Sequence, residues 1–350
     1  MSRGLTFWTD ETIRLIRENF IAVSVPTWLA RAPGPEGDFL RQAGIDKRWV
    51  TSSGYMHCIS ASGRFLGTRP SDAILQKFNE LPAAERAPGA VRVGELAASE
   101  QRIPSPPEGG MVLRVHARFL ARDDTGTLRH ARTTDFPLML AKPKVLRSWT
   151  LFLQPNTEYM WLTRDEWRAL VPPRPVKGQR LEVDPALAMR MARFHLTPQR
   201  ATTSEGGIIH PKLVKEARLG LKVVSVTPQS IRMELAGRIH WGSDYEPGKA
   251  TTPNGPLAQG FASAIEGRLE YDRKTNVFTR FDIVAPGDTW GRWGDANRKS
   301  MYVERPGRSP FGFALERADG KRSTDRIPPG GNGRYVTGRT GYFPDPGKHP

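Results

Sequence analysis

A proline-rich segment with little hydrophobic periodicity, from Pro82 to Gly110, divides the chain into two parts that differ in pattern. It carries five prolines, a composition typical of a linker. The chain has 350 residues, which is enough for two domains. The sequence therefore predicts a first domain over residues 1–82, a linker over 83–110, a second domain over 111–320, and a basic tail rich in glycine and proline over 321–350, either an extended arm or disordered.

Helical and strand patterns alternate in the first part. Ile13, Ile16 and Phe20 recur at helical spacing behind a capping residue, Thr9 or Asp10. Apolar β-branched runs predict strands, and a glycine turn predicts a hairpin. The expected elements are a helix over 9–19, a strand Phe20–Val25, a short helix over 38–43, a strand over 55–60, a hairpin partner over 64–67 and a helix after Ser71.

Three stretches of this part, ENFIAVSV, YMHCISASGRFLG and SDAILQKF, resemble the thioredoxin-like superfamily. The resemblance is to domains of uncharacterised bacterial proteins, planctomycete ones especially, and covers roughly residues 7–82. It implies a thioredoxin-like fold that is incomplete, because the unit with the CxxC motif would lie before Met1 and Thr51–Gly54 replaces the usual cis-proline segment. Either the first strand and helix are missing, or another segment replaces them.

The single cysteine, Cys58, excludes dithiol chemistry within the chain, since a second thiol is needed to resolve the mixed disulfide. Alternation in YMHCIS places Cys58 on the strand face opposite His57 and Ile59. A free cysteine in a central strand is typical of inert core packing. The sequence therefore predicts a domain without redox function.

Strand alternation dominates the second part. Leu113, Val115, Ala117 and Phe119 fall on one face of a strand over 111–120. Further strands are expected over 149–153 and 310–316, hairpins over 219–241 and 261–285, a capping box at Thr163, and a helix over 184–194. The predicted fold class is α+β: an incomplete thioredoxin-like α/β domain followed by a mostly antiparallel β-rich domain with inserted helices.

Nearly all of the net charge of +16 lies in the second part, because residues 1–108 contain 13 Lys and Arg against 12 Asp and Glu. Such a field attracts anions, among them nucleic acid, acidic polysaccharide, anionic lipid and acidic protein. A basic surface without a particular partner is the alternative. We expect no transmembrane helix. Met1 begins no signal peptide, so the chain as written is expected in the cytoplasm, or outside it if a leader was removed.

The segment from Phe281 to Gly294 is the densest candidate binding site. Pro286-Gly287 predicts a turn that ends the strand, after which a loop would present four residues able to hold a sugar, a base or an anion. These are Asp288, Trp290, Arg292 and Trp293. The alternative is a tryptophan-anchored loop that closes the domain. The hairpin with this loop also looks like a module in the same bacterial proteins.

The histidines form no local metal-binding motif, because no two of them lie at HxH, HxxH or HxxxH spacing. No cofactor is predicted apart from a single transition metal. His195, His210 and His240 could converge with Asp282 or Asp288 on a mononuclear site. Structural roles are the alternative, since a histidine that ends a helix stabilises its dipole. Charges on the 261–285 hairpin predict a solvated ladder, with a carboxylate pair for acid–base work as the alternative. They are Glu266, Arg268, Glu270, Asp272, Arg280 and Asp282.

The leading functional hypothesis is a non-redox binding or scaffold protein whose β-rich domain engages an anionic or sugar-like partner. A metal-assisted hydrolase or oxidoreductase with the His/Asp site is the first alternative. A nucleic-acid-binding protein is the second, since arginines and aromatic residues interleave between Arg292 and Arg308.

Overall fold

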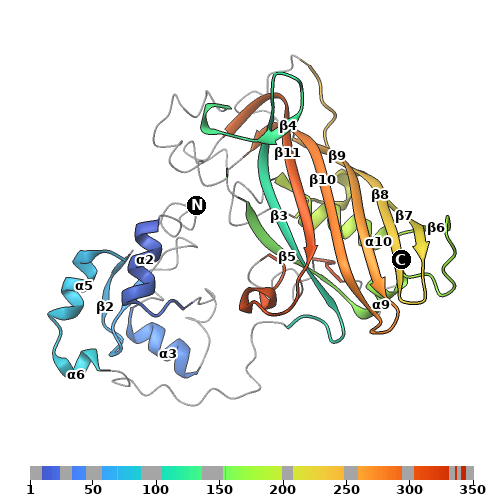
Figure 1. The fold of residues 1–350 in the computed structure, drawn as a ribbon. Helices are drawn as coiled ribbons and strands as arrows, with labels where there is room; N and C mark the ends of the chain where they lie inside the picture. The colour runs from blue at the N-terminus through green and yellow to red at the C-terminus, as the bar shows by residue number, and fades with distance from the viewer. Residues whose placement is uncertain are drawn as a thin grey trace. The chain divides into compact units, whose positions relative to one another are not determined.

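The computed structural model describes residues 10–23, 34–44, 57–68, 70–87, 105–135, 153, 155–198, 208–247, 259–293, 303–330, 336 and 340–343. The chain forms two compact units, Met1–Arg102 and Ile103–Pro350 (Figure 1). The fold is α+β with one large antiparallel sheet. No helix in the described ranges is long and apolar enough to cross a membrane.

The first unit carries short helices and one hairpin. Its described elements are α2 (Asp10–Asn19), α3 (Pro35–Gln42), β1 (His57–Ile59), β2 (Phe65–Thr68), α5 (Asp72–Asn79) and α6 (Ala83–Arg86). The strands pair antiparallel through a turn in which Gly63 adopts φ +81°. Cys58 is buried in a small core with Leu66, Ile74 and Leu81, as the alternation predicted.

The expected strand Phe20–Val25 is wrong over its described residues. The chain leaves α2 at Asn19, and Phe20–Val23 forms no strand. Ile21 is 93% exposed and Val23 is also exposed, so this apolar run is not buried by any neighbouring strand. A β-branched run needs a partner strand to become one, and local propensity does not supply it.

The second unit is built on a nine-stranded antiparallel sheet. The strand order is β4-β3-β11-β10-β9-β8-β7-β6 (Figure 1). The remaining strand, β5, pairs with β3 on the edge away from β11. The strands are β3 (Met111–Arg122), β4 (Leu128–His130), β5 (Asn156–Leu162), β6 (Arg180–Glu182), β7 (Val214–Val226), β8 (Ser230–Gly242), β9 (Gly260–Asp272), β10 (Val277–Trp293) and β11 (Val303–Arg317). The helices are α9 (Arg164–Ala169), α10 (Pro185–Arg190), the π-helical turn η4 (Met191–His195) and the 3-10 turns η2 (Thr133–Asp135), η6 (Pro211–Leu213) and η8 (Ser323–Arg326).

One face of this sheet, called the inner face here, holds the main hydrophobic core. Alternate residues of each long strand point into it, as Leu113, Val115 and Phe119 do on β3. On this side α10 packs on β7, and η4 packs on β7 and β8. Thr163 caps α9 with the predicted capping box. The opposite, outer face carries the charged and small residues.

The predicted loop after Pro286-Gly287 is wrong, because β10 continues through both residues to Trp293. Pro286 lies opposite Gly312 of β11, and Gly287 lies opposite Ser263 of β9. A Cβ atom on Gly287 would lie 2.4 Å from the carbonyl oxygen of Ala262, so glycine here permits close strand approach. Pairing on both sides therefore overrides the local turn signal. The strand predicted over 149–153 lies almost entirely outside the described residues.

The predicted tail, 321–350, contributes to the second unit where it is described. The side chains of Asp325 and Tyr342 are 3% and 2% exposed, respectively. Asp325 lies against β3, and Tyr342 packs with Trp161 of β5 and Phe194 of η4. These contacts join residues far apart in sequence, and local composition does not reveal them.

Candidate functional site

The structure places two of the four predicted binding residues side by side on the outer face. Asp288 and Trp290 lie two residues apart on β10, so strand alternation places both side chains on the same face. Arg292 and Trp293 belong to the same strand, but their side chains are outside the described part of the chain. The candidate site is therefore built on a sheet surface.

Trp290 is packed against its neighbours near one end of the sheet. Its ring lies directly on Gly260 of β9, where an added Cβ would be 2.3 Å from the ring. Its indole N–H donates to the carbonyl oxygen of Ser243 (3.1 Å), and the side chain is 5% exposed. His240 and Tyr245 contact the ring edge-to-face. These contacts fit the alternative of a tryptophan anchor, since they cover the surface that a ligand would stack on.

Asp288 lies between Arg122, which the sequence pattern missed, and Arg308, which it indicated only as part of a nucleic-acid-binding surface. Its carboxylate oxygens are 3.5 Å from Arg122 Nη2 and 3.3 Å from Arg308 Nε. The guanidinium of Arg308 also stacks over Trp290, 5.5 Å from the ring centroid. These arginines come from β3 and β11, strands distant in sequence. Two cations around one carboxylate leave this end of the face positive.

A second basic feature adjoins this cluster, and we name it the arginine pair. Arg218 of β7 lies directly opposite Arg238 of β8, and both are exposed. Neither guanidinium forms an ion pair or hydrogen bond with any residue that the structure describes. Like charges directly opposite each other on neighbouring strands are destabilising. The pair therefore holds positive charge that is not engaged in an ion pair with any described residue.

The residues that follow the arginine pair across β9, β10 and β11 on the outer face are small. On β8, His240 follows Arg238 on this face and leads to the Trp290 cluster. His240 Nε2 also lies 3.9 Å from Asp244, whose carboxylate binds Lys215 at 2.7 Å. The hydrogen bond from Lys215 lowers the pKa of Asp244. From β7 to β3, the residues that lie opposite one another in this line are Arg218, Arg238, Ala264, Pro286, Gly312 and Arg118.

The predicted metal ligands His195, His210 and Asp282 each have a protein partner, whereas His240 Nε2 has no hydrogen-bond partner among the described residues. His195 is fully buried, with Nδ1 2.8 Å from Glu158 and Nε2 2.9 Å from the hydroxyl of Tyr342. Asp282 binds Arg280 on its own strand at 2.5 Å. Within the described residues no three His, Cys, Asp or Glu side chains form a group placed to hold a metal. His210 accepts a hydrogen bond from the backbone of Lys212. The metal site stays a prediction without a ligand set.

The charged hairpin of β9 and β10 forms part of the expected ladder. Register places Arg268 opposite Asp282, and Glu270 opposite Arg280. The ion pairs that form are Arg232–Glu270, at 3.5 Å between β8 and β9, and Arg280–Asp282 within β10. In both ion pairs the partner of the carboxylate is an arginine rather than a second carboxylate. The solvated ladder therefore fits better than a catalytic pair.

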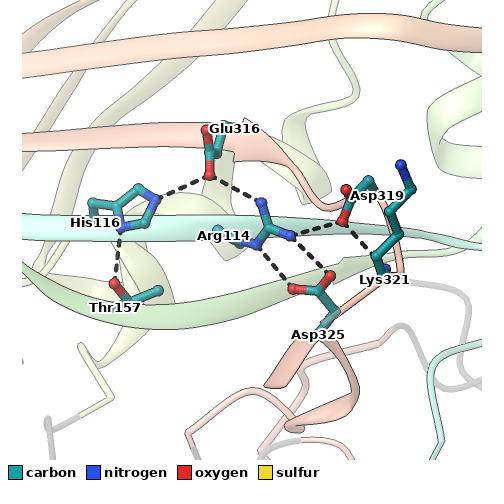
Figure 2. Close-up of polar contacts among 7 residues, drawn as sticks. All are labelled: Arg114, His116, Thr157, Glu316, Asp319, Lys321 and Asp325. Carbon is teal, nitrogen blue, oxygen red and sulfur yellow. Dashed lines mark hydrogen bonds and ion pairs between the residues drawn. The ribbon is translucent and has the colours of Figure 1, made fainter. Parts of the chain in front are cut away.

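A buried cation, Arg114, gathers three carboxylates on the outer face near β5 (Figure 2). It binds both oxygens of Asp325 (2.8 and 2.9 Å), and also Glu316 (3.1 Å) and Asp319 (3.0 Å). The hydrogen bond that Arg114 donates to Asp325 raises the pKa of Arg114. His116 lies beside it, 3.5 Å from Glu316. Because all three carboxylates bind one guanidinium, this cluster holds the segment that follows β11 against the sheet.

No protein-family model, curated protein or solved structure matches the chain.

Proposed function

We propose that this chain is a non-redox binding protein whose second unit engages an anionic partner on the outer face of the sheet. The observation that carries the proposal is the arginine pair, Arg218 opposite Arg238, exposed and without an ion pair or hydrogen bond to any residue that the structure describes. An anion bridging the two guanidiniums would offset their repulsion and satisfy their donors. Arg122 and Arg308, beyond His240, extend the positive surface toward Asp288.

An anionic partner is favoured over a neutral sugar. Sugar recognition depends on an aromatic face free for stacking, and Trp290 is covered by Gly260, Arg308 and Tyr245. The arginine pair on this face presents exposed guanidiniums, whose planar donors match carboxylate, sulfate and phosphate oxygens.

We propose that the first unit is a thioredoxin-like domain without redox function. Support comes from the order α3, β1, β2 and α5, which follows the resemblance, and from the state of Cys58. Burial raises the pKa of the Cys58 thiol to about 11, so little thiolate is present at neutral pH. Because the thiolate is the reactive form, Cys58 suits core packing.

The test compares two double variants that remove the same charge from the same face. Arg218→Gln/Arg238→Gln removes the arginine pair, and Arg232→Gln/Arg280→Gln removes two arginines that have acidic partners. The probes are a heparin oligosaccharide, a short oligodeoxythymidine and neutral maltohexaose, measured by fluorescence anisotropy against salt concentration.

We expect the anionic probes to bind and maltohexaose to fail. Removing the arginine pair should weaken binding several-fold and reduce the salt slope on oligodeoxythymidine by about 1.4, since each lost phosphate contact contributes about 0.7. The control variant should bind like the original chain. Equal losses in both variants would mean that only total charge matters and would overturn the proposal. Binding of oligodeoxythymidine without heparin would favour the nucleic-acid alternative.

A further inference from the structure

The short segment 340–343 is held in the second unit by contacts of the kind that hold a bound peptide. Its backbone is held by side chains: Arg193 Nη2 donates to the carbonyl oxygen of Thr340 (3.4 Å), and Arg190 Nη1 to that of Tyr342 (3.2 Å). Arg190 is the last residue of α10, and Arg193 belongs to η4. Side-chain donors aimed at peptide carbonyls are a feature of segment recognition.

The hydroxyl of Tyr342 is bound on both sides. It accepts the backbone N–H of Trp161 (3.0 Å) and lies 2.9 Å from His195 Nε2. The Glu158 carboxylate accepts, so a neutral His195 carries its proton on Nδ1 and donates it to Glu158 (2.8 Å). Its Nε2 then accepts the proton of the Tyr342 hydroxyl. Burial lowers the pKa of His195, which keeps this neutral tautomer.

The pocket also recognises the two aromatic rings. The ring of Phe194 meets Tyr342 edge-to-face at 5.1 Å, and Arg190 stacks over both Tyr342 and Phe343 at 5.1 Å. Trp161 completes the wall, with apolar side chains of Val112 and Ile208 packed against it. Gly341 adopts φ +70°, a conformation that favours glycine at the bend before Tyr342.

Two further observations mark the pocket as specialised. A π-helical turn forms part of its wall, with Leu196 N–H donating to the carbonyl oxygen of Met191 at 2.8 Å, and such turns recur at functional sites. The buried Trp161 Nε1 and Arg190 Nε have no hydrogen-bond partner in the described part of the chain. The wall therefore holds donors beyond those that the segment uses.

We propose that this pocket is a recognition site for a Gly-Tyr-Phe peptide and that the chain fills it with its own residues 340–343 as a tethered ligand. Docking places the Tyr342 hydroxyl on a backbone N–H of β5, on the edge away from β3. An uncovered strand edge is a template for pairing with another chain. The docked segment thus occupies one backbone donor of this edge, and its release would expose that donor.

The test supplies the segment in trans to the full chain. In Tyr342→Ala the pocket lacks its resident side chain, and a fluorescein-labelled peptide with the sequence of residues 338–345, GRTGYFPD, is titrated by anisotropy. We expect saturable binding to Tyr342→Ala and none to the original chain, whose pocket is filled. The Tyr342→Phe peptide should bind about tenfold more weakly, because it leaves a buried donor and acceptor unpaired. Equal binding of the two peptides, or equal binding to both chains, would overturn the proposal.

A milder variant tests the proposal if Tyr342→Ala does not fold. Tyr342→Phe keeps the ring and removes only the hydroxyl, and hydrogen exchange of the Trp161 amide is then compared with the original chain. We expect the Trp161 amide to exchange at least tenfold faster in the variant. Tyr271→Phe, which removes an exposed hydroxyl bond to Asn276, is the control and should leave that amide unchanged. Unchanged exchange in Tyr342→Phe would contradict the docking contact.

Discussion

Arg114 and Asp325 lie 211 positions apart and form a two-pronged ion pair in which both side chains are nearly inaccessible to solvent (Figure 2). The pair joins β3 to η8, the 3-10 turn that follows β11. Two charges were taken out of water here, and their cost is offset only while both partners are present. The stability of the second unit should therefore be sensitive to either residue.

We expect Asp325→Ala to lower the free energy of unfolding by about 3–5 kcal/mol, since it leaves the Arg114 charge buried with weaker partners. The measurement is urea unfolding followed by circular dichroism. Glu316→Ala is the matched control: Glu316 binds the same guanidinium but is 47% exposed, so its loss should cost about 1 kcal/mol or less. Equal effects of the two substitutions would contradict the buried pair.

Acid should destabilise the chain through His195. Burial and the nearby Arg190 charge lower the pKa of His195 well below 6.5 in the folded state. As the pH falls below about 6.5 the unfolded chain binds a proton that the folded chain does not, so stability present at neutral pH is lost. We expect the melting temperature of the original chain to fall more steeply on acidification than that of His195→Gln. His130→Gln, at an exposed position on β4, should follow the original chain, and a parallel decline in all three would refute this prediction.

The sequence predicted those elements whose signals are local. Alternation from Leu113 to Phe119 identified β3 and its buried face, and the capping box at Thr163 placed the start of α9. Cys58 was expected in a core and is buried. Each of these depends on neighbours within a few positions, which the sequence displays directly.

The candidate site could be predicted only in part, because distant strands complete it. Asp288 and Trp290 stood out by composition, but their partners Arg122 and Arg308 come from β3 and β11. Pro286-Gly287 signalled a turn, and pairing with β9 and β11 overrode it. The role of Tyr342 had no local signal, since its contacts lie on β5 and η4.

Alkali should destabilise the first unit through Cys58. Its folded pKa of about 11 exceeds the ordinary value of 9.0, so the folded state retains a proton that the unfolded chain releases above about pH 9. Stability contributed below pH 9 is lost as the pH rises toward 11. We expect the difference in unfolding free energy between the original chain and Cys58→Ala to shrink across that range. Rapid alkylation of native Cys58 by iodoacetamide at neutral pH would contradict the buried thiol.

Gly260 should tolerate no side chain, because the Trp290 ring occupies the space that a Cβ would take. We expect Gly260→Ala to destabilise the second unit by about 1–3 kcal/mol in urea unfolding, since the ring is held by its bond to Ser243 and cannot shift freely. Gly220→Ala is the control on the same face, where the nearest atom to the added Cβ lies 3.5 Å away. In a Trp290→Leu background the cost of Gly260→Ala should fall, because the two residues are in contact and their effects are not additive. An undiminished cost in that background would show that the strain at Gly260 has another origin than the indole ring.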